Sequence, residues 1–386
     1  MPQPTPPTRR VAIIGTGAIA HAHADAVRAL APRIEIVAVV DLDADRARGF
    51  AERFAPGARV YPDAEALLAA ERLDLVHVCT PPQTHMPLGV AALRAGVPVL
   101  IEKPTALSLA EMDELARVSR ETGIPALTVF QHRFGAAAVR LRSMLASGAL
   151  GRPLVATCET LWYRTPDYFD VPWRGRWEVE GGGPTMGHGI HQFDLLLSVL
   201  GPWSRLTAFA ARQALPTDTE DVSMALVEFE GGALATVVNS IVSTRETSRL
   251  RFDFAHASVE VEHLYGYTDA DWTFTPAPGH EHLADVWAGD ADGGADDTAA
   301  DARSSHRDQL AAILDAFDGG DPGEPVAADA DDARRTLEFA AATYASAFRG
   351  RPVSAGELSH GDPFWRSMDG GAVPWPPLKP AVAATR

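Results

Sequence analysis

The sequence contains little cysteine and no long hydrophobic run. Its two cysteines, Cys79 and Cys158, lie in strand-like segments, a pattern typical of reduced and packed thiols. No run reaches the roughly 18 apolar residues that a membrane-spanning helix requires. Arg9 and Arg10 precede an apolar segment, as in a twin-arginine export signal, but glycines interrupt that segment. We therefore expect a cytoplasmic globular protein without disulfides and without a membrane partner.

Positive charge is also scarce. The chain has 34 lysine and arginine residues against 51 aspartate and glutamate residues, which gives a formal net charge of −17. Binding to a phosphate backbone needs clustered basic side chains, and the sequence has no basic stripe, so we expect no nucleic-acid partner. Five aspartates lie close together in the segment 290–301, whose mixture of Asp, Ala and Gly predicts a solvated loop.

An apolar run, residues 11–14, leads into a glycine-rich turn of the type GxGxxA and then into a helical pattern. The first glycine permits a tight turn, the second lets the backbone approach a pyrophosphate, and the small Ala20 allows close packing of helix on strand. This motif predicts a nucleotide-binding site at the amino end of a helix. The predicted cofactor contacts in the turn are Gly15, Thr16, Gly17, Ala18 and Ile19.

An acidic residue follows the second predicted strand, residues 34–40, as a dinucleotide site requires. Asp41 is placed to accept hydrogen bonds from both ribose hydroxyls and to repel a 2′-phosphate, which favours NAD over NADP. Two other interpretations stay open at this point. Asp41 or Asp43 can cap the next helix, and Arg46 and Arg48 keep NADP possible.

Strand and helix patterns alternate from residue 10 to about residue 130, which predicts a parallel sheet with crossover helices. Beyond residue 134 β-type runs dominate, with helices expected at 136–147, 186–200, 302–317 and 331–348 and a hairpin at Gly231-Gly232. We predict an α/β domain with a doubly wound parallel sheet over residues 1–130. A second, α+β domain with a mostly antiparallel sheet follows over 131–360, and a C-terminal tail over 361–386.

Several short motifs occur in a characteristic order. They are Thr80-Pro81-Pro82-Gln83-Thr84-His85, Glu102-Lys103-Pro104, Gln131-His132-Arg133-Phe134, a triple glycine at 181–183 before a helix with His191, and the segments 305–309 and 344–347. In this order the chain resembles the Gfo/Idh/MocA oxidoreductases over nearly its whole length. The resemblance implies a Rossmann domain followed by an open-faced sheet domain, with NAD or NADP bound between them. It also implies a sugar or polyol substrate and pairing of the sheets into homodimers or tetramers.

Removal of a hydride from a secondary alcohol requires that the hydroxyl proton also leaves, so the site needs a base and a positive group near the oxygen. Lys103 follows a parallel strand at its carboxyl edge, where ligands of such sheets bind, and a neutral His191 is a suitable base. The resemblance assigns Lys103 to catalysis and cofactor contact and His191 to catalysis. The further cofactor contacts that we predict are Thr80, Pro81, His85, Glu102 and Gln131.

The chain departs from the family pattern four residues before His191. Gly187 stands there in place of the usual aspartate, and His188 follows it. His188 lies one helical turn before His191, so it can replace the missing acid as a substrate contact or remain a polar residue of the first turn. The spacing of His188, His191 and Asp194 also suits metal ligation, but the three positions drift around a helix, and we predict no metal site.

Aromatic and basic residues cluster between positions 162 and 177. Aromatic faces pack on the CH groups of sugars, and guanidinium groups bind hydroxyls or carboxylates. We therefore predict oxidation or reduction of a secondary alcohol of a sugar, cyclitol or glycoside. The alternatives are a redox glycosidase or keto-sugar eliminase with tightly bound NAD and a non-catalytic sugar sensor. The predicted substrate contacts are His188, Arg133, Tyr163, Arg164, Trp173 and Trp177.

Overall fold

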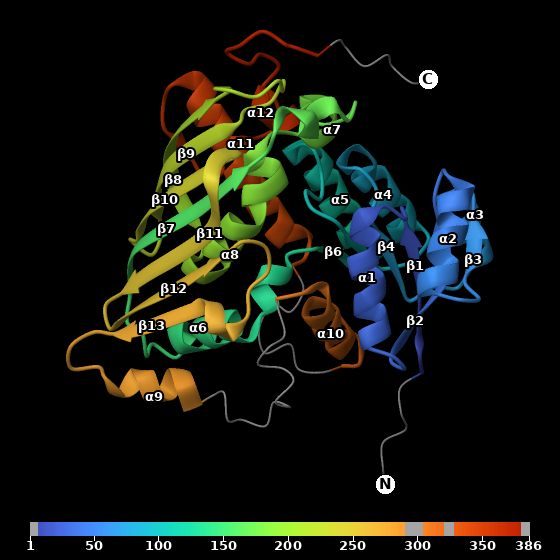
Figure 1. Ribbon diagram of the computed structural model, residues 1–386, viewed down its shortest axis with the longest axis horizontal. Coiled ribbons are helices and arrows are strands. Elements are labelled where there is room, and N and C mark those ends of the chain that lie inside the picture. The colour runs from blue at the N-terminus through green and yellow to red at the C-terminus, as the bar shows by residue number, and fades with distance from the viewer. Residues whose placement is uncertain (1–6, 290–303, 320–327, 380–386) are drawn as a thin grey trace. The chain divides into compact units, whose positions relative to one another are not determined.

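The computed structural model describes residues 7–289, 304–319 and 328–379 (Figure 1). The acidic segment 290–301 lies outside the described residues. The chain divides into two compact units, one within residues 1–106, 111–134 and 305–334 and the other within residues 107–110, 135–304 and 335–386. Among the described residues, no helix combines the length and the apolar character needed to cross a bilayer.

The first unit is built on a six-stranded sheet in the order β3-β2-β1-β4-β5-β6, and every pairing is parallel. The predicted doubly wound fold is thereby confirmed, with one short strand, β3, that was not predicted. The strands are β1 (Arg9–Ile14), β2 (Ile34–Val40), β3 (Arg59–Tyr61), β4 (Leu75–Val78), β5 (Val99–Ile101) and β6 (Ala126–Thr128).

Helices cover this sheet because its strands are continuously apolar and must be buried on both faces. Helices α1 (Ala18–Ala29) and α10 (His306–Phe317) bury Val27, Leu310 and Ile313 in one core cluster with β1, β2 and β4. Helix α4 (His85–Arg94) packs closely at Gly89, where a Cβ would lie 2.8 Å from Ile101 Cδ1 of β5 and 3.0 Å from Leu115 Cδ1 of helix α5 (Leu109–Thr122). The remaining helices of this unit are α2 (Ala44–Phe54) and α3 (Ala64–Ala70).

The first unit also contains residues 305–334, which we expected in the second domain. The physical reason lies in the last strand of the sheet. Gln309 of α10 accepts a hydrogen bond from the Phe130 backbone N–H at 3.0 Å and donates one to the Thr128 carbonyl at 2.6 Å. The Thr128 N–H bonds to the Ala328 carbonyl at 2.7 Å, so this returning segment satisfies the backbone groups at and beyond β6.

The second unit is built on an eight-stranded sheet in the order β13-β12-β11-β7-β10-β9-β8-β14. Its pairings are antiparallel except that of β10 with β7, which confirms the expected, mostly antiparallel sheet. The strands are β7 (Pro153–Tyr163), β8 (Trp203–Ala211), β9 (Val222–Phe229), β10 (Leu234–Ser240), β11 (Val242–Phe254), β12 (Ala257–His263), β13 (Trp272–Pro276) and β14 (Val353–Ser354). The predicted hairpin joins β9 to β10, with Gly232 at a φ of +84°.

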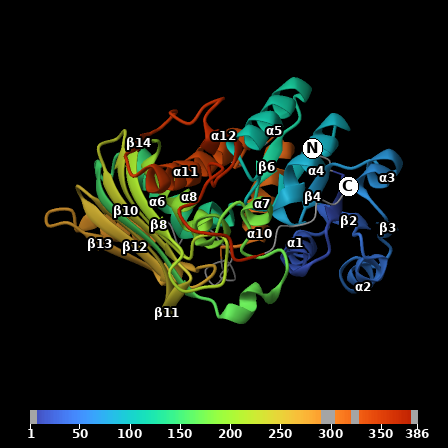
Figure 2. The ribbon, with the colours of Figure 1, turned by 90° about the horizontal axis from the view of Figure 1, so that it is seen from above.

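One face of this second sheet is covered and the other is open. Figures 1 and 2 show α8 (Ile190–Leu200) and α11 (Ala330–Arg349) on one face, with α6 (Ala136–Ala146) beside α8. The opposite face carries no helix among the described residues. The other helices are α7 (Trp177–Glu180), α9 (His282–Gly289) and α12 (Pro363–Arg366), the last of which lies in the predicted tail.

Candidate functional site

The turn between β1 and α1 has the geometry of a dinucleotide cradle. Gly15 adopts a φ of +89°, and a Cβ there would lie 2.8 Å from the carbonyl carbon and oxygen of Cys79. Gly17 is exposed at the amino end of α1, and among the described residues no side chain caps it. The first N–H groups of α1 are therefore available to an anion, and the turn fits the pyrophosphate of a dinucleotide.

Asp41 lies directly after β2 and is bonded to this turn. Its Oδ2 accepts hydrogen bonds from the Thr16 backbone N–H at 2.9 Å and hydroxyl at 2.7 Å, and from Arg46 Nε at 3.0 Å. Burial alone would raise the pKa of Asp41, but the hydrogen bonds from Arg46, Asp43 and Thr16 hold it well below the usual range. Asp43, not Asp41, caps α2, because its side chain accepts the N–H groups of Asp45 and Arg46. The carboxylate that we predicted for the ribose is thus ionised and already paired with Arg46.

The loop after β4 is tied to the loop after β5 by a buried histidine. His85 Nε2 lies 2.7 Å from the Thr80 carbonyl, and its Nδ1 lies 2.8 Å from the Pro104 carbonyl. Thr84 donates a hydrogen bond to the Pro81 carbonyl at 2.8 Å. His85 is buried, so its role in the structure is to hold the Thr80-Pro81 loop next to the Lys103-Pro104 turn.

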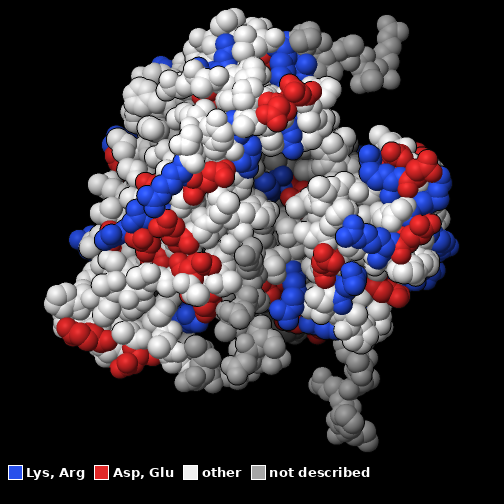
Figure 3. Space-filling model, viewed as in Figure 1, with Lys and Arg blue, Asp and Glu red and all other residues white. Residues whose placement is uncertain are grey.

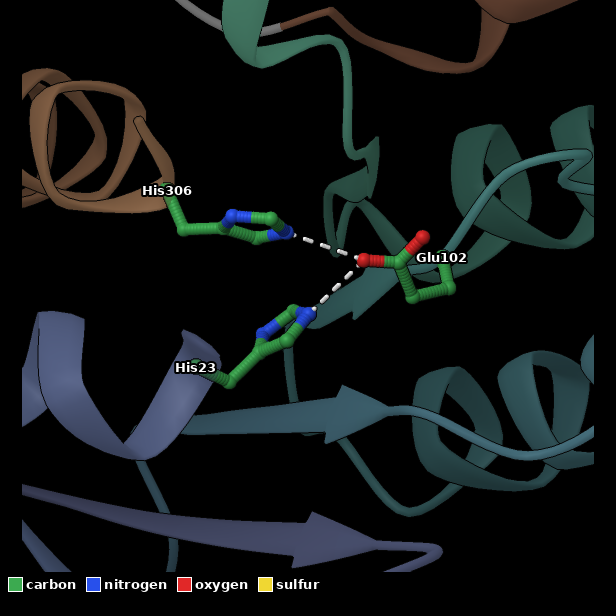
Figure 4. A group of neighbouring side chains, drawn as sticks. All are labelled: His23, Glu102 and His306. Carbon is green, nitrogen blue, oxygen red and sulfur yellow. Dashed lines mark hydrogen bonds and ion pairs between the residues drawn. The ribbon is translucent and has the colours of Figure 1, made fainter. Parts of the chain in front are cut away.

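Lys103 follows β5, and its backbone is bonded to the residue before it. The Lys103 N–H donates to Glu102 Oε2 at 3.1 Å, while Glu102 Oε1 receives the Nε2 atoms of His23 and His306 at 3.0 Å each (Figure 4). Burial alone would raise the pKa of Glu102, but the bonds from the two imidazoles hold it well below its usual range. Glu102 is therefore a buried carboxylate engaged by three donors of its own unit, and its predicted cofactor contact stays a prediction. Sequence reasoning did not single out His23, and it noted His306 only as part of the motif 305–309.

Two predicted residues at the end of the first unit are buried in it. Gln131 is 2% exposed, and Arg133 forms an ion pair of 3.0 Å with Asp332 and stacks over Phe130 at 5.3 Å. Through this ion pair, the Arg133 guanidinium joins the returning segment, which contains Asp332, to the residues after β6. The substrate contact that we expected of Arg133 stays a prediction, and the guanidinium is already engaged in this ion pair.

In the second unit, the helix that we predicted over 186–200 begins with a π-helical turn, Thr185–Gly189, which carries His188. Helix α8, with His191, follows. A Cβ on Gly183 would lie 1.9 Å from the Glu220 carbonyl oxygen, and one on Gly189 would lie 1.8 Å from Asn239 Oδ1. Glycine thus lets the turn pack directly on neighbouring backbone and side chain. π-Turns occur frequently at functional sites.

A buried carboxylate fixes the start of this turn. Glu220 accepts hydrogen bonds from the Gly183 N–H at 2.8 Å, the Thr185 N–H at 3.1 Å and the Tyr344 hydroxyl at 2.8 Å. Burial raises the pKa of Glu220 to about 7, although these bonds act in the opposite direction. Sequence reasoning missed Glu220, because its partners come from two distant segments of the chain, residues 183–185 and Tyr344.

Aromatic rings surround the two histidines. His188 contacts Trp162 and Tyr168 with ring centroids 5.0 and 6.4 Å apart, and His191 contacts Tyr265 at 5.9 Å. Arg164 stacks over Trp162 at 4.9 Å and over Tyr168 at 5.4 Å. We call Trp162, Tyr168, His188, His191 and Tyr265 the histidine–aromatic cluster. Tyr265 was not predicted, because nothing in its local sequence relates it to the segment around residue 162.

The other predicted substrate residues of this unit separate into two groups. Tyr163, next to Arg164, is exposed, and Trp173 lies under the Arg174 guanidinium at 4.5 Å. Trp177 instead donates its indole N–H to the Asp218 carbonyl at 2.8 Å and packs edge-on against Tyr344 at 5.1 Å. The Trp177 indole is thus engaged in packing, and the substrate contact that we expected of it stays a prediction.

The raised pKa of Glu220 predicts a pH-dependent stability. Between the unfolded pKa of 4.5 and the folded value of about 7, the folded protein retains a proton that the unfolded chain releases. The free energy of unfolding should therefore fall as the pH rises through this interval, by up to about 3 kcal/mol. Glu220→Gln should remove this part of the slope in urea unfolding measured from pH 4.5 to 7.5. The exposed Glu230→Gln is the control, and an identical slope in Glu220→Gln and wild type would contradict the prediction.

Comparison with known proteins agrees with both units. A family model described as the oxidoreductase family with an NAD-binding Rossmann fold matches residues 9–130, and the Gfo/Idh/MocA C-terminal domain model matches residues 138–260. The chain is 30% identical to the D-glucoside 3-dehydrogenase of Escherichia coli, over 66% of this chain and 78% of that protein. It is 29% identical to the D-apiose dehydrogenase of Paraburkholderia graminis over 94% of each chain.

A solved structure is similar over nearly the full length. The WlbA dehydrogenase of Chromobacterium violaceum, determined in complex with NADH and UDP-GlcNAcA, superposes with a TM-score of 0.79 at 25% identity, over 93% of this chain and 99% of that one. The described fold, the cradle and these similarities lead to one assignment. The chain belongs to the Gfo/Idh/MocA family of oxidoreductases.

Proposed function

We propose that this oxidoreductase transfers a hydride between NAD and a secondary alcohol of a sugar, cyclitol or glycoside. One observation carries the proposal. The cradle after β1 and Lys103 after β5 lie at the carboxyl ends of parallel strands of the same sheet, where such sheets bind their ligands. Alcohol oxidation requires two elements. One is a cradle that accepts the dinucleotide, and the other is an ammonium group at the same edge of the sheet.

The residues of the first unit would hold the cofactor. The N–H groups of Gly17, Ala18 and Ile19 would face the pyrophosphate, with Gly15 and Thr16 shaping the turn. Thr80 and Pro81 would line the nicotinamide side, held in place through His85. Bound NAD supplies the hydride acceptor.

Lys103 and His191 would have separate roles at the substrate oxygen. The Lys103 ammonium donates a hydrogen bond to the oxygen and stabilises negative charge as the proton leaves, and the His191 imidazole accepts that proton. Because Gly187 replaces the family aspartate, His191 acts without a carboxylate at that position, and His188 contacts a substrate hydroxyl.

The proposed substrate class follows from the histidine–aromatic cluster and from the relatives. Trp162, Tyr168 and Tyr265 offer ring faces and edges beside the two imidazoles, which suits a polyhydroxylated ring with alternating CH and OH groups. Two relatives are named as dehydrogenases of a D-glucoside and of D-apiose. Tyr163, Arg164 and Trp173 would extend the same surface.

A screen of sugars, glycosides and inositols with NAD, followed by reduced-nicotinamide fluorescence, tests the reaction. On the best substrate, Lys103→Met should lower kcat/KM by about 10² to 10⁴-fold, because the ammonium that stabilises the oxygen is lost. The Kd for NAD should stay within threefold of wild type. The exposed cation Arg94 of the same unit provides the control Arg94→Met. Normal turnover in Lys103→Met, or glycoside cleavage without net NADH, would contradict the proposal.

Asp41 should set the preference for NAD. In Asp41→Ala the guanidinium of Arg46 loses its partner and faces the ribose position as a cation, which attracts a 2′-phosphate. The ratio of Kd for NADP to Kd for NAD should therefore fall at least about tenfold, equivalent to about 1.4 kcal/mol. Titration calorimetry with both nucleotides measures the ratio, and Asp45→Ala, at an exposed neighbouring acid, is the control. An unchanged ratio would show that Asp41 does not distinguish the ribose hydroxyls of NAD from the 2′-phosphate of NADP.

We also propose that the open face of the second sheet pairs with a second copy of the chain. Phe209, Met224, Leu226 and Leu234 are exposed on it, around a groove of about 590 Å³ between β7 and β8. Figure 3 shows positive and negative side chains side by side on this part of the surface. Arg249 on β11 forms an ion pair with Glu260 on β12. A surface with an apolar centre and both positive and negative side chains around it is complementary to the same surface on a second copy of the chain.

Leu226→Glu should weaken this association, because a carboxylate would be buried against an apolar partner surface. Light scattering after size exclusion should give at least twice the chain mass of 41.2 kDa for wild type and a smaller mass for the variant. Leu42, which is 95% exposed in the first unit, provides the control Leu42→Glu. A monomeric wild-type protein would refute the proposal.

A further inference from the structure

Four buried side chains of the first unit form a continuous chain of hydrogen bonds. His77 on β4 and His23 on α1 face each other with their Nδ1 atoms 2.9 Å apart. His23 Nε2 and His306 Nε2 each lie 3.0 Å from Glu102 Oε1, and the rings converge on that carboxylate from two different helices (Figure 4). The side chains of His23, Glu102 and His306 are 1%, 6% and 10% exposed.

The protons in this chain can be assigned from chemistry. Burial lowers the pKa of His23, so a neutral ring carries one N–H. That hydrogen must lie on Nε2, because a lone pair facing the Glu102 carboxylate would be repelled. His23 Nδ1 is then the acceptor, and His77 donates its Nδ1–H to it. His306 donates its own Nε2–H to Glu102, so Glu102 accepts three donors in all, the third being the Lys103 backbone N–H.

We propose that His23 and His306 are positioning residues for Lys103. They keep Glu102 ionised and oriented, and Glu102 in turn fixes the backbone N–H of Lys103. His306 is contributed by α10, so the returning segment 305–334 completes the support of the lysine-bearing turn. This inference rests on the proposed function, in which Lys103 acts on the substrate oxygen.

The same three groups are also of the type that binds zinc, and their ligand atoms lie within 4.8 Å of one another. The hydrogen-bond arrangement favours a proton on each of the two Nε2 atoms over a bound zinc ion. Both Nε2 atoms address one carboxylate oxygen at 3.0 Å, a normal N–H···O distance, and the second oxygen accepts the Lys103 N–H. Stoichiometric zinc in the purified protein would overturn the proposal, and a metal-free protein with the same turnover supports it.

The kinetic test uses three variants of adjacent residues on α10. His306→Ala should lower kcat at least about tenfold while the Kd for NAD stays within twofold, because the cradle is untouched. His306→Gln, which retains an N–H donor, should recover most of kcat. The exposed Arg307 provides the matched control, Arg307→Ala, which should behave as wild type. Equal kcat in His306→Ala and Arg307→Ala would overturn the proposal, as would equal losses in His306→Ala and His306→Gln.

A spectroscopic test does not depend on turnover. Lys103 and Lys379 are the only lysines of the chain, so protein labelled with ¹³C at lysine Cε gives two signals, which Lys103→Met assigns. In His306→Ala, Glu102 loses one of its two imidazole donors, and the carboxylate that holds the Lys103 N–H is no longer fixed. The chemical shift of the Lys103 signal should therefore change, while that of Lys379 stays. A Lys103 signal unchanged from wild type would overturn the proposal.

Wild-type protein labelled with ¹⁵N at histidine provides a measurement that needs no variant to fold. His23 and His306 should be protonated on Nε2 and His77 on Nδ1; any other tautomer at His23 or His306 would overturn the proposal. The two failures are distinguishable. If Lys103→Met turns over normally, the proposed function fails. If Lys103→Met is inactive but His306→Ala changes neither kcat nor the chemical shift of Lys103, only the positioning role fails.

Discussion

A buried carboxylate must be surrounded by donors, and this requirement organises the loops that carry the candidate site. Glu102 accepts two imidazole N–H groups and the backbone N–H of Lys103, and Glu220 accepts two backbone N–H groups and a tyrosine hydroxyl. Leaving any donor out would leave a charged or polar group buried without compensation. In each unit, therefore, one buried acid holds a turn that carries a candidate site residue, Lys103 in the first and His188 in the second.

The second constraint is the close approach of backbones, which only glycine permits. At Gly15 a side chain would collide with the Cys79 carbonyl, and at Gly183 with the Glu220 carbonyl. Gly15 lies in the cradle itself, and the Gly183 N–H is bonded to the Glu220 carboxylate. The acids and the glycines thus act together, because a carboxylate can reach the backbone N–H groups of a turn only if the turn can come near.

Local patterns in the sequence were sufficient for the parallel sheet of the first unit apart from β3, for the cradle, and for the position of Lys103 at the end of β5. Each of these depends on residues that are near one another in the chain. His306 and Tyr265 could not be found in this way, because they join the site only through tertiary folding. For Arg133 the residue type suggested a substrate contact, but the sequence could not show that Asp332, about two hundred positions later in the chain, pairs with it. The π-turn was missed because it arises from contacts at Gly183 and Gly189, not from hydrophobic periodicity.

The paired state of Asp41 changes how coenzyme preference should be understood. In the proposed complex with NAD, the ribose hydroxyls would compete with Arg46 for the two oxygens of Asp41. The net gain from NAD would then be the difference between two sets of charge-assisted hydrogen bonds, one made to the guanidinium and one to the hydroxyls. The Thr16 N–H and hydroxyl donate to Oδ2 and hold the carboxylate in place. In this proposal Asp41 sets the coenzyme preference together with its partner Arg46.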